Sequence, residues 1–506
     1  MVLITYKSYP AGVTSKDLPA LSARSAEQLA RAEATILGHR EVLLPLVQAF
    51  ADRGERLYLV GGPVRDALMG RLGHDLDFTT SARPEVTLDL IGPMASATWE
   101  TGIEFGTVAA QVRGQQVEIT TFRSDTYDGV TRNPEVRFGD TLEGDLVRRD
   151  FRVNAMAVEL VVDADGSGDQ AQLGLRFHDP LGGLSDLIRG VIDTPAAPEQ
   201  SFGDDPLRML RAARFKAQLG FEVAPRVRAA MTEMAAHIDR ITVERVRAEL
   251  DKMMASAAPW SGWELLVATG VCDRVVPEVS GLHLTPDEHL QHKDVYQHSM
   301  TVLRQAMEQE ETPEADLVLR WAALLHDCGK PATRAAKPGG GVSFHQHEVV
   351  GAKLARKRMR KLKYPKQFIA DVSQLIFLHM RFYGFSDGQW TDSAVRRYVT
   401  DAGELLPRLH KLVRADCTTR NKRKAARLRA GYDRLEERIE EIQRREDLAR
   451  VRPDLDGNEI MQILGLKPGP QVGRAWAFMK DLRLEEGPLD RDEAVARLKA
   501  WWEEQE

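Results

Sequence analysis

Two glycines and two carboxylates near the start of the chain have the types and spacing of a phosphoryl-transfer site. Gly61 and Gly62 follow an apolar run at 57–60, and Asp75 and Asp77 alternate around a leucine a short distance further on. A glycine pair permits a tight turn that exposes backbone N–H groups to an anion. Residues two apart on a strand share a face, so both aspartates can share Mg²⁺. Because two-metal phosphoryl transfer needs such a carboxylate pair, the combination predicts a nucleotidyl-transfer site, although either pattern alone is common in surface turns.

Other charged and polar residues in the first third of the chain are candidates to complete this site. Arg65 follows the glycines and can donate charge-assisted hydrogen bonds to triphosphate oxygens. Glu118 lies in an alternating run that fits a strand beside the aspartates, either as a third carboxylate or as an outward-facing residue. Arg149, Asp150 and Asn154 are candidates for sugar and phosphate contacts, with surface ion pairs as the alternative.

A stripe of arginines beginning near Asp205 could read a nucleotide base. Arg208, Arg211 and Arg214 recur every three residues, and a helix would bring them to one side, with Asp205 about one turn before. A carboxylate accepts a hydrogen bond and a guanidinium donates. Cytosine and adenine both present an amino donor beside a ring-nitrogen acceptor, whereas guanine and uracil present the reverse. One Asp–Arg pair could therefore accept C and A and reject G and U; the alternative is a helix-capping aspartate in a local ion pair.

Histidines concentrate in the second half of the chain, where they could bind metal. Eight of the 13 histidines fall between His283 and His379. An adjacent histidine and aspartate at the end of an apolar helix can converge on one ion, and this donor set suits a divalent transition metal or Mg²⁺. His345 is assigned to an ordinary surface or core role. The full candidate set for a two-metal site is His298, His326, Asp327, His347, His379 and Asp416.

The elements that must position these groups divide the chain into a mixed first part and a helical remainder. Periodicity predicts an irregular leader through residue 24, helices at 25–52 and 84–91, and strands at 57–60, 75–77, 107–112, 116–122 and 158–162. Residues 123–139 are polar and rich in turn residues, which predicts a loop. From residue 204 onward nearly every segment has a helical pattern. The predicted fold class is a mixed α/β head followed by an all-α neck, body, histidine-rich domain and tail.

Five segments, in this order, resemble a known family: LVGGPVRD, DLD, RRDFRVNAMA, DDPLRMLRAARF and RITVERVRAEL. Together they resemble the class II tRNA nucleotidyltransferase and bacterial poly(A) polymerase family of the DNA polymerase beta superfamily, over about residues 40–275. The family adds C, C and A to tRNA 3′ ends from CTP and ATP without a nucleic-acid template. The resemblance implies that Asp75 and Asp77 are catalytic. The implied triphosphate and sugar contacts are Gly62, Arg65, Arg149 and Asp150.

The same resemblance implies that Asp205 and Arg208 act as a protein template for the incoming base, with Arg211 and Arg214 also near the nucleotide. One departure is Asp204, where the family usually has glutamate. Residues 123–139 would correspond to a loop thought to assist the switch from C to A. The ordered histidines and aspartates of the second half resemble HD-domain phosphohydrolases, which implies phosphatase or cyclic phosphodiesterase action if that site is active.

Composition limits the kinds of partner. The formal net charge is −6, so RNA contacts must come from local basic patches. No run of 18 apolar residues predicts a membrane span, and the first residues do not read as a secretory signal. The three cysteines lie far apart, which predicts no disulfide framework and a reduced cytoplasm. The candidate RNA contacts are Lys353, Arg356, Lys357, Arg360, Lys361, Lys422, Arg423 and Lys424.

The predicted enzyme is a CCA-adding tRNA nucleotidyltransferase with Mg²⁺ at the head and a divalent metal of unknown identity in the HD domain. Its predicted partners are the tRNA 3′ end, CTP and ATP, with no membrane and an open oligomeric state. The alternatives are a poly(A) polymerase and an HD-type nucleotide phosphohydrolase. The predicted divisions are an extension at 1–40, a head at 41–190, a neck at 191–285, an HD domain at 286–445 and a tail at 446–506.

Overall fold

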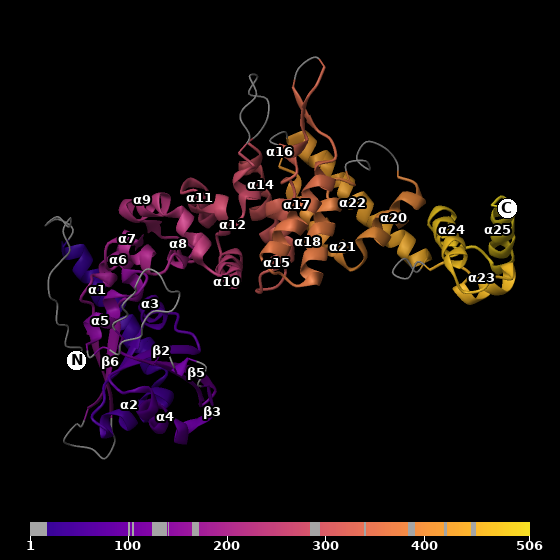
Figure 1. Ribbon diagram of the computed structural model, residues 1–506. Coiled ribbons are helices and arrows are strands. Elements are labelled where there is room, and N and C mark those ends of the chain that lie inside the picture. Colours follow the sequence, from indigo (N-terminus) through magenta and orange to yellow (C-terminus); the bar gives the residue numbers. More distant parts are fainter. Residues whose placement is uncertain are drawn as a thin grey trace. The chain divides into compact units, whose positions relative to one another are not determined.

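The chain of 506 residues is described here from a computed structural model (Figure 1). The structure describes residues 18–99, 102–103, 106–123, 139, 141–163, 172–283, 294–338, 341–382, 390–418, 422–446 and 452–505. The chain forms two compact units. Unit 1 comprises Met1–Met253 and Ala257–Arg274, and unit 2 comprises Met254–Ser256 and Val275–Glu506. The finer five-part division stays a prediction.

A mixed sheet forms the centre of unit 1. In the described part of this unit it has seven strands in the order β3-β4-β5-β2-β1-β6-β7. The strands β2 and β5 pair parallel, and the other neighbours pair antiparallel. Their bounds are β1 Leu57–Val60, β2 Asp75–Thr80, β3 Ala95–Trp99, β4 Thr107–Val112, β5 Gln115–Thr121, β6 Ala157–Asp163 and β7 Gln172–His178.

One face of this sheet is covered by helices and the other carries the acidic residues. Helices α2 (Arg40–Asp52) and α4 (Pro84–Ile91) pack against strands of the sheet. In β2, Leu76 and Phe78 are buried, whereas Asp75 and Asp77 alternate with them and are exposed. The alternation predicted from the sequence is therefore present, and it sends both aspartates to the same face.

Strand pairing brings four residues into one row across the sheet. Asp77 pairs with Glu118, Glu118 with Ala109, and Ala109 with Trp99 at the edge. Directly opposed residues on neighbouring strands share a face. The pairing of β3 with β4 shifts register between Ala95 and Ala97, and this bulge sets which face Trp99 takes.

The rest of unit 1 is mainly helical. Helix α1 (Leu18–Leu37) contacts α3 (Gly62–Leu68). Since α1 begins at Leu18, the expectation of an irregular leader through residue 24 was wrong for residues 18–24. Helix α8 (Leu207–Leu219) packs closely on α11 (Pro259–Ala268). The absence of a side chain at Gly262 permits this, since a Cβ there would lie only 2.9 Å from the carbonyl oxygen of Ala213. The remaining elements of unit 1 are α5 Leu142–Val147, α6 Gly183–Arg189, α7 Pro198–Asp204, α9 Pro225–Glu233, α10 Val243–Met254, α12 Val271–Val275 and the short strands β8 Val191–Ile192 and β9 Glu222–Val223.

Unit 2 is built almost wholly of helices. Its described elements are α13 Pro277–Ser280, α14 Val295–Met307, α15 Leu317–Leu325, α16 Lys330–Thr333, α17 His347–Lys361, α18 Lys366–Leu378, α20 Asp392–Ala402, α21 Leu406–Asp416, α22 Lys422–Arg445, α23 Gly457–Leu464, α24 Pro470–Glu486 and α25 Arg491–Glu503. A short hairpin, β10 Arg334–Ala336 and β11 Val342–Phe344, is the one addition to the predicted all-helical pattern in the described parts. A separate apolar core that includes Leu455, Met479 and Leu498 holds the last three helices together. The predicted α/β head followed by helical regions is confirmed.

Two further expectations concern cysteines and membranes. Cys272, Cys328 and Cys417 form no disulfide bond with one another. Among the described residues, none of the helices is both long and apolar enough to cross a bilayer.

Candidate active site and metal centre

A tight turn joins β1 to α3. Gly61 has φ +74° and ψ −135°, a backbone conformation that residues with a Cβ rarely adopt. A Cβ there would also lie 3.0 Å from Nη1 of Arg149 and 4.0 Å from Oδ2 of Asp77. The glycine therefore allows the backbone to approach both a basic and an acidic group of the site. The tight turn is as predicted, and its contact with an anion stays a prediction.

Two carboxylates from neighbouring strands lie side by side on one face of the sheet. Asp77 on β2 is opposite Glu118 on β5 in a parallel pairing, which resolves the two alternatives for Glu118 in favour of a place beside the aspartates. Asp77 is reachable by solvent, yet the surrounding protein atoms, together with Glu118 and Asp75, raise its pKa to about 6. Such mutual repulsion marks a place where a cation is favoured.

A cavity of about 430 Å³ opens above these carboxylates. Its lining combines four carboxylates with six arginines, and this mixture of charges suits a metal-bound nucleoside triphosphate. The lining residues are Val60, Gly61, Gly62, Asp77, Phe78, Thr107, Glu118, Thr120, Arg123, Arg148, Arg149, Asp150, Asn154, Asp205, Leu207, Arg208, Arg211 and Arg245, with Arg123 as a sixth arginine beside the strands.

Buried carboxylates hold the arginines in place. Asp145 is fully buried and bridges Arg148 (2.9 Å) and Arg149 (3.0 Å). Asp150 accepts from Nε of Arg211 at 2.7 Å and from Nδ2 of Asn154 at 3.0 Å. Burial alone would raise the pKa of Asp150, but Arg211 and Asn154 lower it to about 2. Asp150 therefore orients neighbours as a permanent anion, and its direct contact with a sugar stays a prediction.

The predicted base-reading pair stands at the N-terminus of α8. Oδ1 of Asp205 accepts from the backbone N–H of Leu207 (3.1 Å), and Oδ2 pairs with Arg245 (2.9 Å). Arg208 donates to Oγ of Ser201 at 2.7 Å and to the carbonyl of Arg148 at 2.5 Å. Asp205 caps the first turn of α8 and also lines the cavity, so its role in base reading stays a prediction.

Two predicted nucleotide contacts, Arg65 and Arg214, are not among the residues that line the cavity. Arg65 is 8% exposed, donates to Oδ1 of Asn154 at 2.6 Å and is held by its neighbour Asp66. Arg214 pairs with Glu249 at 2.7 Å and lies over the Phe215 ring. The i, i+3 spacing could not show that Arg214 turns away from the cavity. Each step of three residues falls short of a full helical turn, so the third arginine has rotated further around α8.

Some cavity residues were not among the candidates. Arg148 and Arg245 both occur in segments quoted for the family resemblance, so their motif membership was an available signal. Asp145 had no local signal, since an aspartate in a short helix is ordinary until its two arginine partners are seen. Thr107 and Thr120, whose hydroxyls are 2.9 Å apart, likewise had none.

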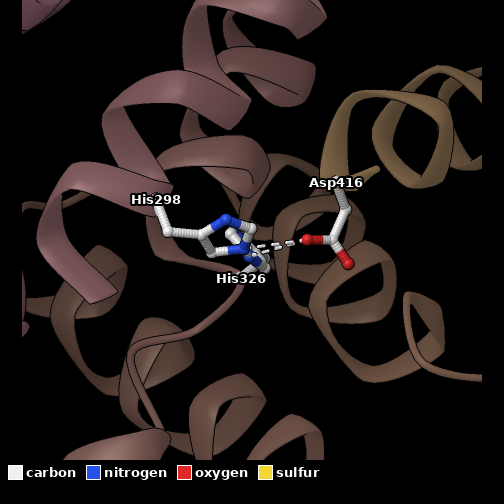
Figure 2. Close-up of side chains that lie close together, drawn as sticks. All are labelled: His298, His326 and Asp416. Atoms are coloured by element: carbon white, nitrogen blue, oxygen red, sulfur yellow. Dashed lines mark hydrogen bonds and ion pairs between the residues drawn. The ribbon is translucent and has the colours of Figure 1, made fainter. Parts of the chain in front are cut away.

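All six predicted metal ligands of the second half come together in unit 2. Figure 2 shows three of them, His298 from α14, His326 after α15 and Asp416 at the end of α21. Nε2 of His298 lies 2.9 Å from Oδ1 of Asp416 and 3.2 Å from Nε2 of His326. Asp327, His347 and His379 form the adjoining group, and in the described residues these two groups of three could each hold a metal ion.

The histidine rings are oriented by hydrogen bonds to their own chain. The Nδ1 atoms of His326, His347 and His379 each donate to the carbonyl three residues earlier, at 2.6–2.8 Å. This fixes the tautomer and turns Nε2 toward the centre, as is typical of metal-ligating histidines. Nε2 of His347 and of His379 is buried without a hydrogen-bond partner, so the donor set fits a metal.

Electrostatics in this cluster favour positive charge. Burial would lower the pKa of His326, but Asp327 and Asp416 raise it to about 10. Lys330 also donates to Oδ2 of Asp327 at 2.6 Å. Burial and the nearby His326 lower the pKa of His379 to about 4, which keeps that ring neutral. A divalent cation would satisfy the same carboxylates and use the neutral ring nitrogens.

The predicted basic patch lies on an exposed face of α17. Lys353, Arg356, Lys357, Arg360 and Lys361 are all exposed. Arg423 on α22 is exposed as well, whereas the side chains of Lys422 and Lys424, and the whole of 124–138, lie outside the described residues.

Comparison with known proteins identifies three family matches. Residues 57–193 match the poly A polymerase head domain, residues 220–282 match the probable RNA and SrmB-binding site of polymerase A, and residues 295–421 match the HD domain. In fold, the chain is similar to the crystal structure of the Bacillus stearothermophilus CCA-adding enzyme in complex with CTP. The TM-score is 0.63 at 24% identity, over 92% of this chain and 98% of that one.

Curated relatives divide by the extent of the match. The A-adding tRNA nucleotidyltransferase of Deinococcus radiodurans is 35% identical over 88% of this chain and 95% of its own. The CC-adding tRNA nucleotidyltransferase of Thermus thermophilus is 30% identical over 87% and 93%. The CCA-adding enzyme of Levilactobacillus brevis is 39% identical over 46% of this chain and 54% of its own. The chain belongs to the tRNA nucleotidyltransferase family.

Proposed function

We propose that this chain adds C, C and A to the 3′ end of tRNA from CTP and ATP, releasing pyrophosphate. The observation that carries the proposal is the cavity of unit 1, in which Asp77 and Glu118 face a bank of arginines and the Asp205–Arg208 pair. The carboxylates suit the metal and the reacting phosphate, and the arginines suit the rest of the triphosphate. The Asp205–Arg208 pair suits the base. The names of the relatives support tRNA as the acceptor.

Asp75, Asp77 and Glu118 are the residues that would hold Mg²⁺, because an all-carboxylate set suits this hard cation. When bound, the metal supplies activation of the attacking hydroxyl and neutralises charge on the phosphate. Arg149 and Arg211, with the backbone at Gly61 and Gly62, hold the triphosphate so that its α-phosphate lies in line with the tRNA 3′-hydroxyl. Asp145 and Asp150 keep these arginines extended into the cavity.

Base selection is assigned to Asp205 and Arg208. A carboxylate opposite the amino group and a guanidinium opposite the ring nitrogen match the pairing edges of C and A. The partners of both side chains in the free protein, Arg245 and Ser201, hold them ready at the edge of the cavity. The exposed basic face of α17 and Arg423 are proposed to contact tRNA phosphates, with binding that weakens as salt rises. Three cysteines that form no disulfide with one another suit the reducing cytoplasm.

A specific observation favours a second candidate, addition of only part of the CCA end. The two relatives that match across nearly the whole chain are an A-adding and a CC-adding enzyme, whereas the L. brevis CCA-adding enzyme matches over less than half of it. The pairing edge that Asp205 and Arg208 recognise is shared by C and A, so this pair does not separate the three activities.

A gel assay with three tRNAs tests both candidates. The tRNAs end before CCA, after the first C, or after CC, and each receives CTP, ATP or both. Complete addition to all three from the two nucleotides supports the CCA assignment. If only the CC-ended tRNA is extended, by one A, the chain is an A-adding enzyme instead. If addition stops after CC, the chain is a CC-adding enzyme. Long A tails from ATP alone would move the chain to poly(A) polymerase.

The histidine cluster of unit 2 is proposed to bind one or two divalent metals independently of the head. We expect His326→Ala to lower metal affinity at least about 100-fold, since even outer-shell changes at such sites cost 10- to 100-fold. Metal content of the purified chain, by elemental analysis, measures this. His345→Ala is the matched control, because His345 is exposed and lies outside the cluster. Equal metal content in all three proteins would contradict the site.

A further inference from the structure

A second cavity adjoins the first on the same face of the sheet. It has a volume of about 390 Å³ and is lined by Trp99, Gly102, Thr107, Ala109, Gln116 and Glu118. Thr107 and Glu118 also line the larger cavity, so the two spaces meet at the carboxylates. A molecule that enters the smaller cavity therefore reaches the reacting centre from the side of the edge strand.

The register of the sheet explains why Trp99 lies in this cavity. Asp77, Glu118, Ala109 and Trp99 form one row on one face. With neighbouring strands about 4.8 Å apart, the backbones of Asp77 and Trp99 are separated by about 14 Å. Ala109 carries only a methyl group, which leaves the row open between the carboxylate and the indole. The free span is of the size that one nucleotide occupies.

The two cavities differ in charge, and this difference assigns their occupants. The larger one is lined by arginines that suit a triphosphate, whereas the smaller one has Glu118 as its sole charged lining residue among the described positions. A base and its ribose fit such a surface, and a triphosphate does not. The nucleotide that attacks carries its hydroxyl at the carboxylates and has no triphosphate, so the smaller cavity is the place for the acceptor.

We propose that Trp99 stacks on the base of the 3′-terminal nucleotide of the acceptor RNA and so positions its hydroxyl at Asp77 and Glu118. This rests on the proposed function, and it assigns the acceptor side of the site. Trp99 is 45% exposed, and it is among the few large apolar side chains of the described residues that are so open to solvent. Aromatic side chains bind unpaired nucleotides by stacking, which is tolerant of base identity. That tolerance suits an acceptor whose last base changes during addition.

The test compares Trp99→Ala, Trp99→Phe and Thr98→Ala. Thr98 is also exposed on β3 but alternates to the opposite face, so its variant controls for changes in the strand. We expect Trp99→Ala to raise KM for the truncated tRNA about tenfold or more, with KM for the nucleotide unchanged. Trp99→Phe should restore most of the affinity, and Thr98→Ala should leave both values as in the unmodified protein.

A second acceptor separates stacking from a structural effect. A tRNA whose 3′-terminal nucleotide lacks its base has nothing to stack on Trp99. This tRNA should therefore bind the unmodified protein and Trp99→Ala equally weakly. An unchanged KM for tRNA in Trp99→Ala, or a rise in KM for the nucleotide alone, would overturn the proposal. Failure of the unmodified protein to extend any tRNA would instead overturn the proposed function, so the two failures are distinct.

Discussion

Replacement of Asp77 by asparagine is expected to reduce nucleotide addition by at least about 10³-fold. Loss of a single group that stabilises developing charge typically costs 10²–10³ in rate, and Asp77 would both hold the metal and, through it, orient the attacking oxygen. The asparagine keeps the volume of the side chain but removes the charge that makes this place attractive to a cation. The measurement is the initial rate of tRNA extension at saturating CTP and ATP.

The matched control for this change is Asp89→Asn. Asp89 is an exposed aspartate on α4, and α4 packs on the face of the sheet opposite the carboxylates. Nucleotide binding, followed by fluorescence of a labelled ATP, should persist in both variants. If Asp77→Asn kept more than a tenth of the rate, the carboxylate row would not be the reacting centre.

The second large effect is expected in base selection. We predict that Asp205→Asn lowers the preference for CTP over UTP about 100-fold or more, measured as the ratio of kcat/KM values. Sites that recognise a substrate by hydrogen bonds reject a mismatched partner strongly because buried polar groups are left unpaired. An amide can both donate and accept, so it no longer penalises the uracil carbonyl that takes the place of the cytosine amino group. The change would also remove the ion pair with Arg245 that holds the side chain in place.

Asp204→Asn provides the neighbouring control. Asp204 ends α7, one residue before Asp205, and it does not line the cavity. It is also the position at which the chain departs from the family's usual glutamate. The same loss of selectivity in both variants would indicate a general disturbance of this helix junction, and an unchanged CTP to UTP ratio in Asp205→Asn would remove Asp205 from base recognition.

Features that depend on local periodicity were predictable from the sequence. Alternation placed Asp75 and Asp77 on one face of a strand, and glycine requirements marked the turn at Gly61. The histidine cluster was also recoverable, because its donor types are rare enough that their order along the chain carries information. For the strand and the turn, a few neighbouring residues contain the physical reason, whereas the cluster was predicted from the order of its ligands over residues 298–416.

Features that depend on pairing between distant segments were not predictable. Glu118 had two equal interpretations until the parallel pairing of β5 with β2 put it beside Asp77. Arg65 and Arg214 were assigned to the nucleotide, yet they bind Asn154 and Glu249, which are distant in sequence, and neither arginine lines the cavity. Trp99 gave no signal at all, because an aromatic residue at the end of an edge strand has meaning only once its neighbours across the sheet are known.

The bulge in β3 makes the acceptor side of the site depend on how the edge strand accommodates one residue. If Ser96 paired regularly with β4 instead of bulging, pairing from Ala95 would place Thr98 opposite Ala109 and would turn Trp99 to the helix-covered face. The bulge thus decides which side chain the incoming RNA end meets. Deletion of Ser96 would remove the bulge and keep Trp99 opposite Ala109, whereas a regularly paired residue inserted between the bulge and Trp99 would turn Trp99 out of the row.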